Sequence, residues 1–460
     1  MTRYELTPTY ENLRDTFIKD TISRDISLVH FLNLLNSIDD RCSIALDGAW
    51  GSGKTFFVRQ AKMILDAYND FIVADYLEED KELIKSSYQH LNEEAICFQP
   101  HVCVYYDAWE NDNDDDPILS IVYSILKSVE TDFSFKKGVN CFKIAASILD
   151  FFTGKNWSNV VSAFKSEDPI ADLKAEKDIK ETVNQFFKEL LIEKGDRLVV
   201  FVDELDRCSP NYAVKVLERI KHYFDNERIT FVFSTNISEL QHTIKKCYGN
   251  NFDSGKYLDR FFDLRISLPQ ADLRKYYQSL EFNETYYVYD MVCHAVVKSF
   301  NFQLREISKY ISITKAAAYD ATHDSGGKYE FIFPEGKTKQ FLLLRLVPII
   351  IGLRLGDGKK YNDFINGLDS SALWSVCKNL DHHLFEGLLS DKETYGESVG
   401  DCLHVDYEKR ICELYDAIFM HTYTDIERHK KIGEYIFSES TKKELCNIAN
   451  LFSEFSSYNN

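Results

Sequence analysis

A glycine-rich segment that ends in lysine and threonine lies near the start of the chain. Residues 48–55 read GAWGSGKT, which fits the pattern G-x-x-x-x-G-K-[ST], and they follow the apolar run Ser43–Asp47. Glycines in this pattern let backbone N–H groups curl around phosphates, and the N-terminus of a following helix adds positive potential. The segment therefore predicts a nucleoside-triphosphate site, with Lys54 at the β- and γ-phosphates and Thr55 at Mg²⁺.

The residues expected to contact the nucleotide in this segment are contiguous. They are Gly48, Ala49, Trp50, Gly51, Ser52, Gly53, Lys54, Thr55 and Phe56. Helical spacing through Lys62 and Leu65 predicts that the loop opens a helix, which is the context that the pattern requires. A chance glycine turn is the alternative, and this context together with a second motif disfavours it.

The second motif is the apolar run Leu198–Asp203 followed directly by Glu204. Asp203, at the end of a predicted strand, is expected to hold Mg²⁺ through water, and Glu204 to orient or deprotonate the attacking water. Acidic residues at strand ends are common. The functional interpretation therefore depends on Lys54 lying in the same domain.

Three arginines are candidates to stabilise the charge that develops on the γ-phosphoryl oxygens: Arg207, Arg260 and Arg305. An ordinary salt bridge explains Arg207 equally well, because Asp206 and Glu204 are close to it in the sequence.

Arg260 lies in the segment Tyr257–Phe262, where a related ATPase would place a residue at a subunit edge. A guanidinium can bind two phosphate oxygens at once, so Arg260 at such an edge could contact the nucleotide of a neighbouring subunit. We therefore expect a homo-oligomer or a protein effector partner. Pairing with Asp259 or Asp263 in a purely structural role explains the same residues.

Two polar residues, Thr235 and Asn236, follow the apolar run Ile229–Ser234. They are placed where a γ-phosphate could be sensed, and Asn236 is counted among the nucleotide contacts. A turn residue at Asn236 is an equal alternative.

The motifs lie at the ends of short apolar runs that alternate with helix-like segments. These runs are Ser43–Asp47, Val102–Tyr106, Leu198–Asp203, Ile229–Ser234 and Asp263–Leu268. Continuous apolar runs suit strands buried on both faces, so the pattern predicts an α/β fold with a parallel sheet sandwiched by helices. Ser209 and Pro210 predict the start of one of these helices, as its cap and its first residue.

The pattern changes to helical periodicity after Pro269, with the aromatic stretch Lys328–Phe333 as an exception. We expect a nucleotide-binding domain over residues 1–270 and a mostly helical domain over residues 271–460. A segment near residues 128–165 separates two strands by more than a crossover requires, which predicts an insertion in the first domain.

Further segments match a known pattern, namely Tyr105–Trp109, Val202–Cys208, Leu217–Lys221, Tyr257–Phe262 and Leu268-Pro269, with a weaker match at Leu304–Tyr310. Together they resemble the KAP family of P-loop NTPases, in the division with an extra strand between the two Walker strands. Asp107 stands where that family commonly has Asn. The resemblance implies ATP binding, slow hydrolysis and a nucleotide-driven switch or assembly, and bacterial members are often linked to defence against phage.

The composition limits the partners and the location. The net charge of −19 over 460 residues is spread along the chain, which disfavours a nucleic-acid partner. The 11 cysteines are scattered without C-x-x-C pairs, which is typical of reduced thiols and predicts a cytoplasmic protein. Many bacterial relatives carry two transmembrane helices in the region that corresponds to Ser128–Lys165, but here the apolar patch around Ile144–Phe152 is too short to cross a bilayer. The longest apolar run, Phe341–Leu355, is interrupted by Arg345, Pro348 and Arg354, so no span is expected.

Two alternatives to a nucleotide-driven switch or assembly ATPase remain. One is an interaction scaffold that binds nucleotide with little hydrolysis, against which the intact Glu204 argues. The other is a nucleic-acid-linked ATPase, which the acidic balance and the lack of helicase motifs disfavour.

Overall fold

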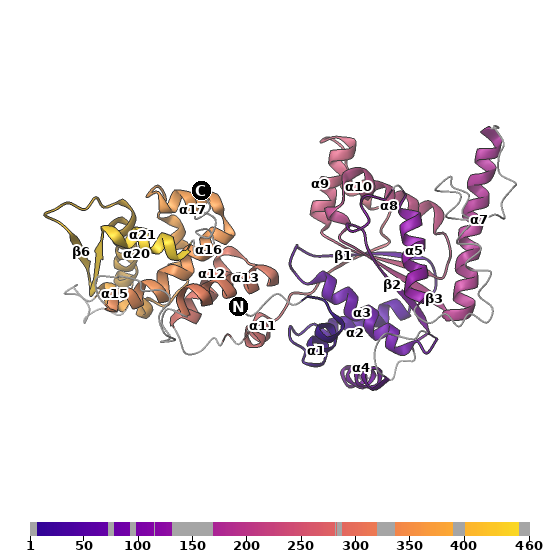
Figure 1. Ribbon diagram of the computed structural model, residues 1–460, viewed down its shortest axis with the longest axis horizontal. Coiled ribbons are helices and arrows are strands. Elements are labelled where there is room, and N and C mark those ends of the chain that lie inside the picture. The colour runs from indigo at the N-terminus through magenta and orange to yellow at the C-terminus, as the bar shows by residue number, and fades with distance from the viewer. Residues whose placement is uncertain are drawn as a thin grey trace, which may run out of the picture. The chain divides into compact units, whose positions relative to one another are not determined.

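The computed structural model describes residues 7–71, 78–92, 98–114, 116–130, 169–280, 282, 288–319, 336–389 and 401–449. The chain divides into two compact units, Thr7–Asp272 and a second unit that begins at Leu273 (Figure 1). Within the described ranges, no helix is both long enough and apolar enough to cross a membrane.

The first unit contains a five-stranded sheet in which every pairing is parallel. Its strands are β1 (Cys42–Asp47), β2 (His101–Asp107), β3 (Arg197–Asp203), β4 (Ile229–Thr235) and β5 (Leu264–Ser267). The order across the sheet is β2-β3-β4-β1-β5, so β4 lies between the two motif strands β1 and β3. The predicted parallel α/β sheet is confirmed, and each apolar run matches its strand to within one residue at either end.

The strand register brings the polar strand ends to one edge of the sheet. Asp47 at the end of β1 lies beside Thr235 of β4, and Asp203 of β3 lies beside Ser234. On the other side of β3, Asp203 pairs with Asp107 of β2. Three carboxylates and the glycine-rich loop therefore share the carboxyl edge of the sheet, where ligands bind in open α/β sheets.

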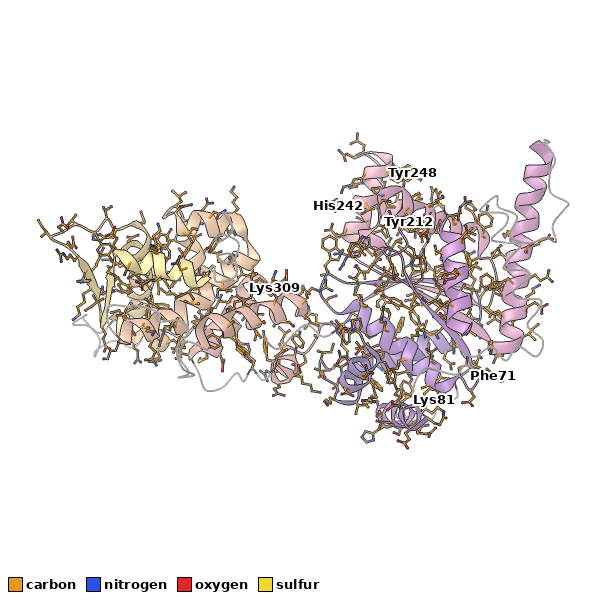
Figure 2. All side chains as sticks on the ribbon, in the orientation of Figure 1. Phe71, Lys81, Tyr212, His242, Tyr248 and Lys309 are labelled. Atoms are coloured by element: carbon orange, nitrogen blue, oxygen red, sulfur yellow. The ribbon has the colours of Figure 1, made fainter. Side chains whose placement is uncertain are left out.

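Helices cover both faces of the sheet. One face packs against α1 (Tyr10–Ile18), α2 (Asp25–Asn36), α3 (Lys54–Tyr68) and α4 (Glu78–Leu91), and the other packs against α5 (Pro117–Glu130), α7 (Pro169–Lys194), α8 (Pro210–Tyr223), α9 (Ile237–Tyr248) and α10 (Ser254–Leu258). Successive strand residues point to opposite layers: Ile44 and Leu46 join the core of α1–α4, and Ala45 joins the other. Tyr212 of α8, labelled in Figure 2, reaches β2, where its hydroxyl lies 2.6 Å from that of Tyr106.

The start of α8 differs from the prediction in one detail. Pro210 is the first helical residue and Ser209 precedes it, but the Ser209 side chain makes no capping hydrogen bond. Its hydroxyl instead donates to Asp112 Oδ1 at 2.8 Å. The serine therefore joins the loop after β2 to the start of α8.

The second unit is mostly helical. Its described helices are α11 (Leu273–Ser279), α12 (Val288–Phe300), α13 (Leu304–Thr314), α15 (Gly336–Phe341), α16 (Val347–Gly356), α17 (Gly358–Ile365), α18 (Ser371–Cys377), α19 (Glu386–Leu389), α20 (Asp401–Tyr415) and α21 (Glu439–Ala449). A Cβ at Gly352 of α16 would lie 2.1 Å from Val296 Cγ1 of α12, so glycine permits this close helix contact. The antiparallel pair β6 (His429–Ile432) and β7 (Tyr435–Ser438) was not anticipated from the sequence.

Two expectations fall on residues that the structure leaves undescribed. The aromatic stretch Lys328–Phe333 lies wholly outside the described ranges. The insertion expected near residues 128–165 lies outside them from residue 131 onward.

Candidate nucleotide-binding site

The glycine-rich loop joins the end of β1 to the start of α3. Gly51 and Gly53 have φ angles of 77° and 94°, which side-chain-bearing residues rarely adopt. A Cβ at Gly48 would lie 3.0 Å from Ser52 Oγ and 3.2 Å from Leu268 Cβ. The loop conformation therefore depends on glycine at positions 51 and 53, and the space around Gly48 is tight for any side chain.

Lys54 is the first residue of α3, and its ammonium turns back to the loop. Lys54 Nζ donates to the carbonyl oxygens of Gly48 at 2.7 Å and Ala49 at 3.2 Å. Burial lowers the pKa of this lysine, and the negative charges of Asp206 and Asp203 oppose that shift. The surrounding acids thus help to keep a buried cation charged, as a phosphate ligand must be.

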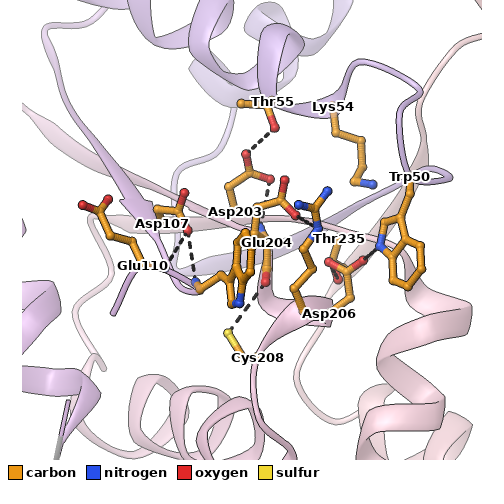
Figure 3. Close-up of polar contacts among 12 residues, drawn as sticks. Trp50, Lys54, Thr55, Asp107, Glu110, Asp203, Glu204, Asp206, Cys208 and Thr235 are labelled. Carbon is orange, nitrogen blue, oxygen red and sulfur yellow. Dashed lines mark hydrogen bonds and ion pairs between the residues drawn. The ribbon is translucent and has the colours of Figure 1, made fainter. Parts of the chain in front are cut away.

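Thr55 and Asp203 bring the two sequence motifs into direct contact. Thr55 Oγ1 donates to Asp203 Oδ2 at 2.7 Å (Figure 3), and the hydroxyl of Tyr105 donates to the same carboxylate oxygen at 2.9 Å. Hydroxyl and carboxylate oxygens are the ligands that Mg²⁺ prefers. Ser52 Oγ in the loop is buried without a hydrogen-bond partner among the described residues. These groups fit a site for a nucleotide and Mg²⁺.

Glu204 is held beside Asp203 in an unusual backbone conformation. Its φ of 60° and ψ of 25° lie in the left-handed region, which costs energy for a non-glycine residue. Burial and then the charge of Asp203 raise its pKa to about 7, while Arg207 opposes the shift. A carboxylate with this pKa can accept a proton near neutral pH.

Arg207 forms an ion pair with that glutamate. Its Nε lies 2.5 Å from Glu204 Oε2, and its guanidinium lies over the Trp109 ring, 5.5 Å from the centroid. The salt bridge considered from the sequence is therefore present. The same pair places the guanidinium next to the proposed base.

Asp206 and Thr235 form a second polar cluster at the loop. The indole Nε1 of Trp50 donates to one oxygen of Asp206, and the hydroxyl of Thr235 donates to the other (Figure 3). Asn236 occupies the N-cap of α9, where its side chain accepts from Glu239 N at 3.3 Å. That geometry matches the interpretation of Asn236 as a turn residue.

Arg260 and Arg305 belong to other segments of the chain. Arg260 is exposed, and its guanidinium forms no ion pair with any residue in the described ranges. The partner proposed from the sequence, Asp259, pairs with Arg265 at 2.6 Å instead, and Asp263 accepts from Ser43 N at 2.8 Å. Arg305 belongs to α13 of the second unit.

Asp107 stands where the family commonly has asparagine, and its side chain accepts two backbone hydrogen bonds. Its Oδ1 accepts from the backbone N–H groups of Trp109 and Glu110, both at 3.0 Å. An asparagine oxygen could accept the same bonds, so the substitution preserves this turn.

Other groups that resemble metal ligands have ordinary partners. In the acidic segment that follows β2, Asp112 accepts hydrogen bonds from Ser209, and Asp116 is buried and ion-paired with Arg219 at 2.9 Å. Within the described ranges, no group of three or more His, Cys, Asp or Glu residues is arranged to hold a metal ion.

Three side chains that contact the site are not among the site residues predicted from the sequence. Arg24, which precedes α2 and is 5% exposed, donates from Nη1 to Ser52 O at 2.8 Å. The Tyr105 and Asp206 side chains are the other two. Tyr105 and Asp206 lie within segments that carry the family resemblance, whereas Arg24 follows no recognisable pattern.

The model of the KAP family P-loop domain matches residues 27–285, more than half of the chain. An uncharacterized protein of Methanocaldococcus jannaschii is 26% identical over a region covering 27% of this chain and 84% of that protein. The structure of the Aeropyrum pernix ORC2 protein (ADPNP-ADP complexes) aligns with 93% of this chain and 92% of its own, at 13% identity and a TM-score of 0.30, and carries no conclusion.

Proposed function

The chain belongs to the KAP family of P-loop domains and is a nucleotide-binding NTPase, and from this premise we propose that it binds ATP with Mg²⁺ and hydrolyses it. ATP would lie on the loop of residues 48–55, and turnover would change how the protein packs against a partner or another copy of itself. The proposal includes anti-phage defence, to which bacterial members of the family are often linked.

The contact between Thr55 and Asp203 is the observation that carries the proposal. Their oxygens lie 2.7 Å apart although the residues are separated by 148 positions in the sequence. A chance glycine turn would have no reason to meet the acidic end of a neighbouring strand. The contact supports a shared role for the two motifs in holding Mg²⁺.

Each side chain has one task in the proposed reaction. Lys54 and the loop backbone hold the β- and γ-phosphates, and Glu204 accepts a proton from the attacking water. Thr55 and Asp203 would hold Mg²⁺, which when bound neutralises charge on the phosphate oxygens.

Replacing Lys54 with alanine tests nucleotide binding. Lys54→Ala removes the buried ammonium, so we expect the Kd for ATP in isothermal titration to rise by about 100-fold, as loss of a charge-assisted contact to phosphate predicts. Lys246→Ala, which removes an exposed lysine of α9, is the matched control and should bind as the parent does. Equal affinity of a folded Lys54→Ala protein and the parent would place the nucleotide elsewhere.

Turnover separates the ATPase from the scaffold alternative. Phosphate release that requires Mg²⁺ and disappears in Glu204→Gln supports hydrolysis at this site, whereas tight ATP binding without release supports a scaffold. Stimulation by added DNA would favour the nucleic-acid-linked alternative. Phage plaque counts on cells that carry the parent or Lys54→Ala protein test the defence role.

A further inference from the structure

The buried carboxylate of Asp206 lies between the phosphate-binding loop and the end of β4. We propose that Asp206 is a positioning residue that ties Trp50 of the loop to Thr235 of β4 and thereby holds the loop for the γ-phosphate of ATP. This inference rests on the proposed function and identifies a residue that sets the geometry of its site.

Asp206 is fixed on all sides. It lies in the 3-10 helix η1 (Leu205–Arg207) and is 5% exposed. Its Oδ2 accepts from Trp50 Nε1 at 2.5 Å, and its Oδ1 accepts from Thr235 Oγ1 at 3.1 Å (Figure 3). The hydroxyl of Thr243 in α9 donates to the Asp206 carbonyl at 3.4 Å, which holds the backbone as well.

The loop is attached to Thr235 at two points. Gly48 N donates to the carbonyl of Thr235 at 3.2 Å, and Trp50 reaches the Thr235 hydroxyl through Asp206. Backbone and side chain thus join the first and third residues of the loop to the same strand end. Without Asp206, only the backbone contact would remain.

The attached part of the loop lies at the end that binds the β- and γ-phosphates. The Lys54 ammonium, which reaches those phosphates in this motif, donates to the carbonyls of Gly48 and Ala49, directly before Trp50. A change in the position of Trp50 is therefore expected to weaken contacts to the γ-phosphate more than contacts to the groups that ADP shares with ATP.

Asp206 and Glu204 have different tasks by this geometry. Each carboxylate oxygen of Asp206 accepts one hydrogen bond, from Trp50 or from Thr235, so the group is oriented toward the loop and β4. Glu204 is instead ion-paired with Arg207 and lies beside Asp203. Asp206 therefore acts through the loop and not on the reacting atoms.

The variants follow from the two hydrogen bonds. Asp206→Ala removes both, Trp50→Phe removes the first and keeps an aromatic ring, and Thr235→Val removes the second and keeps the shape. Asp206→Asn can keep both, because its amide oxygen can accept from the indole and its NH₂ can donate to the Thr235 hydroxyl. The asparagine variant is therefore the conservative rescue.

Steady-state hydrolysis and ADP titration test the proposal. Asp206→Ala should lower kcat by about 10- to 100-fold, since both hydrogen bonds of the carboxylate are lost, while the Kd for ADP changes by less than about threefold. Asp206→Asn should recover most of the loss. Trp50→Phe should add little in the Asp206→Ala background, because both changes break the same bond. Trp374→Phe, in α18 of the second unit, is the control for tryptophan loss.

The outcomes separate this inference from the proposed function. If the parent binds ATP but shows no turnover, hydrolysis is absent, and the ratio of ATP to ADP affinity then reports on Asp206 instead. If Asp206→Ala turns over ATP at the parent rate, the positioning role is overturned. Where the parent shows no turnover, an unchanged ratio of ATP affinity to ADP affinity in Asp206→Ala would overturn it as well. If Asp206→Ala weakens the binding of ATP and of ADP equally and also lowers the Tm, the positioning role is overturned as well, because Asp206 then only stabilises the fold.

Discussion

Glu204 combines a strained backbone, an arginine partner and a pKa raised to about 7 by burial and the charge of Asp203. A general base must be ionised, so its activity is lost as the pH falls below that pKa. We expect kcat/KM, which reports the titration of the free enzyme, to rise about tenfold per pH unit below about pH 7 and to level off above it. Glu204→Gln should lose at least about 100-fold in kcat/KM and show no such rise with pH. A pH-independent kcat/KM in the parent would exclude Glu204 as the base.

Arg207 provides the control for this prediction. Its positive charge lowers the pKa of Glu204, opposing the effect of burial. Arg207→Gln should therefore move the rising limb to higher pH by about half a unit or more. If the pH–rate profile of Arg207→Gln rises over the same pH range as the parent's but levels off at a lower rate, Arg207 instead contacts the γ-phosphate. A transition-state contact changes the rate without changing the titration of the base.

At the scale of elements, the phosphate-binding loop is supported from the segment before α2. Arg24 is buried, and burial lowers its pKa to about 10, yet its guanidinium donates to the Ser52 carbonyl in the loop. Arg24→Met would leave that carbonyl without its partner, at a cost of about 1.5–3 kcal/mol. We expect a lower Tm and an ATP Kd raised by about tenfold.

Arg14→Met is the matched control for the Arg24 prediction. Arg14 lies in α1 and pairs with Asp15 and Asp80 near the surface, where such pairs contribute about 0–1 kcal/mol. Its loss should leave ATP affinity unchanged. If Arg24→Met and Arg14→Met bind ATP equally well, Arg24 has no part in shaping the loop.

The sheet and the motif contacts could be predicted because they depend on patterns that are local in the sequence. Apolar runs mark strands, and parallel strands bring their ends to one edge, so Thr55 and Asp203 were expected to cooperate. The contacts of Arg24 and Asp206 could not be predicted in the same way. Neither contact belongs to a strand or loop pattern, and only the packing of η1 and of the segment before α2 beside the loop decides which polar atoms meet.

The β6-β7 hairpin shows the same limit in the second unit. Its strands are four residues each, His429–Ile432 and Tyr435–Ser438, and they are too short for a clear alternating pattern. Phe437 is fully buried and Tyr435 stacks on Phe341 of α15. Packing against a helix thus stabilises a pair of strands that would be marginal alone.

At the scale of the whole molecule, Arg260 is the candidate to act on the nucleotide of a neighbouring copy. It is exposed, and within the described residues its guanidinium has no acidic partner, while the adjacent Asp259 pairs with Arg265. We predict that Arg260→Ala and Lys54→Ala are each inactive but regain part of the ATPase activity when mixed, because some sites then join an intact Lys54 to an intact Arg260. Arg265→Ala, the control, should remain active without mixing. The decisive measurement is phosphate release from mixtures that mass measurement shows to have co-assembled, and no recovery there would rule out an arginine finger supplied by Arg260.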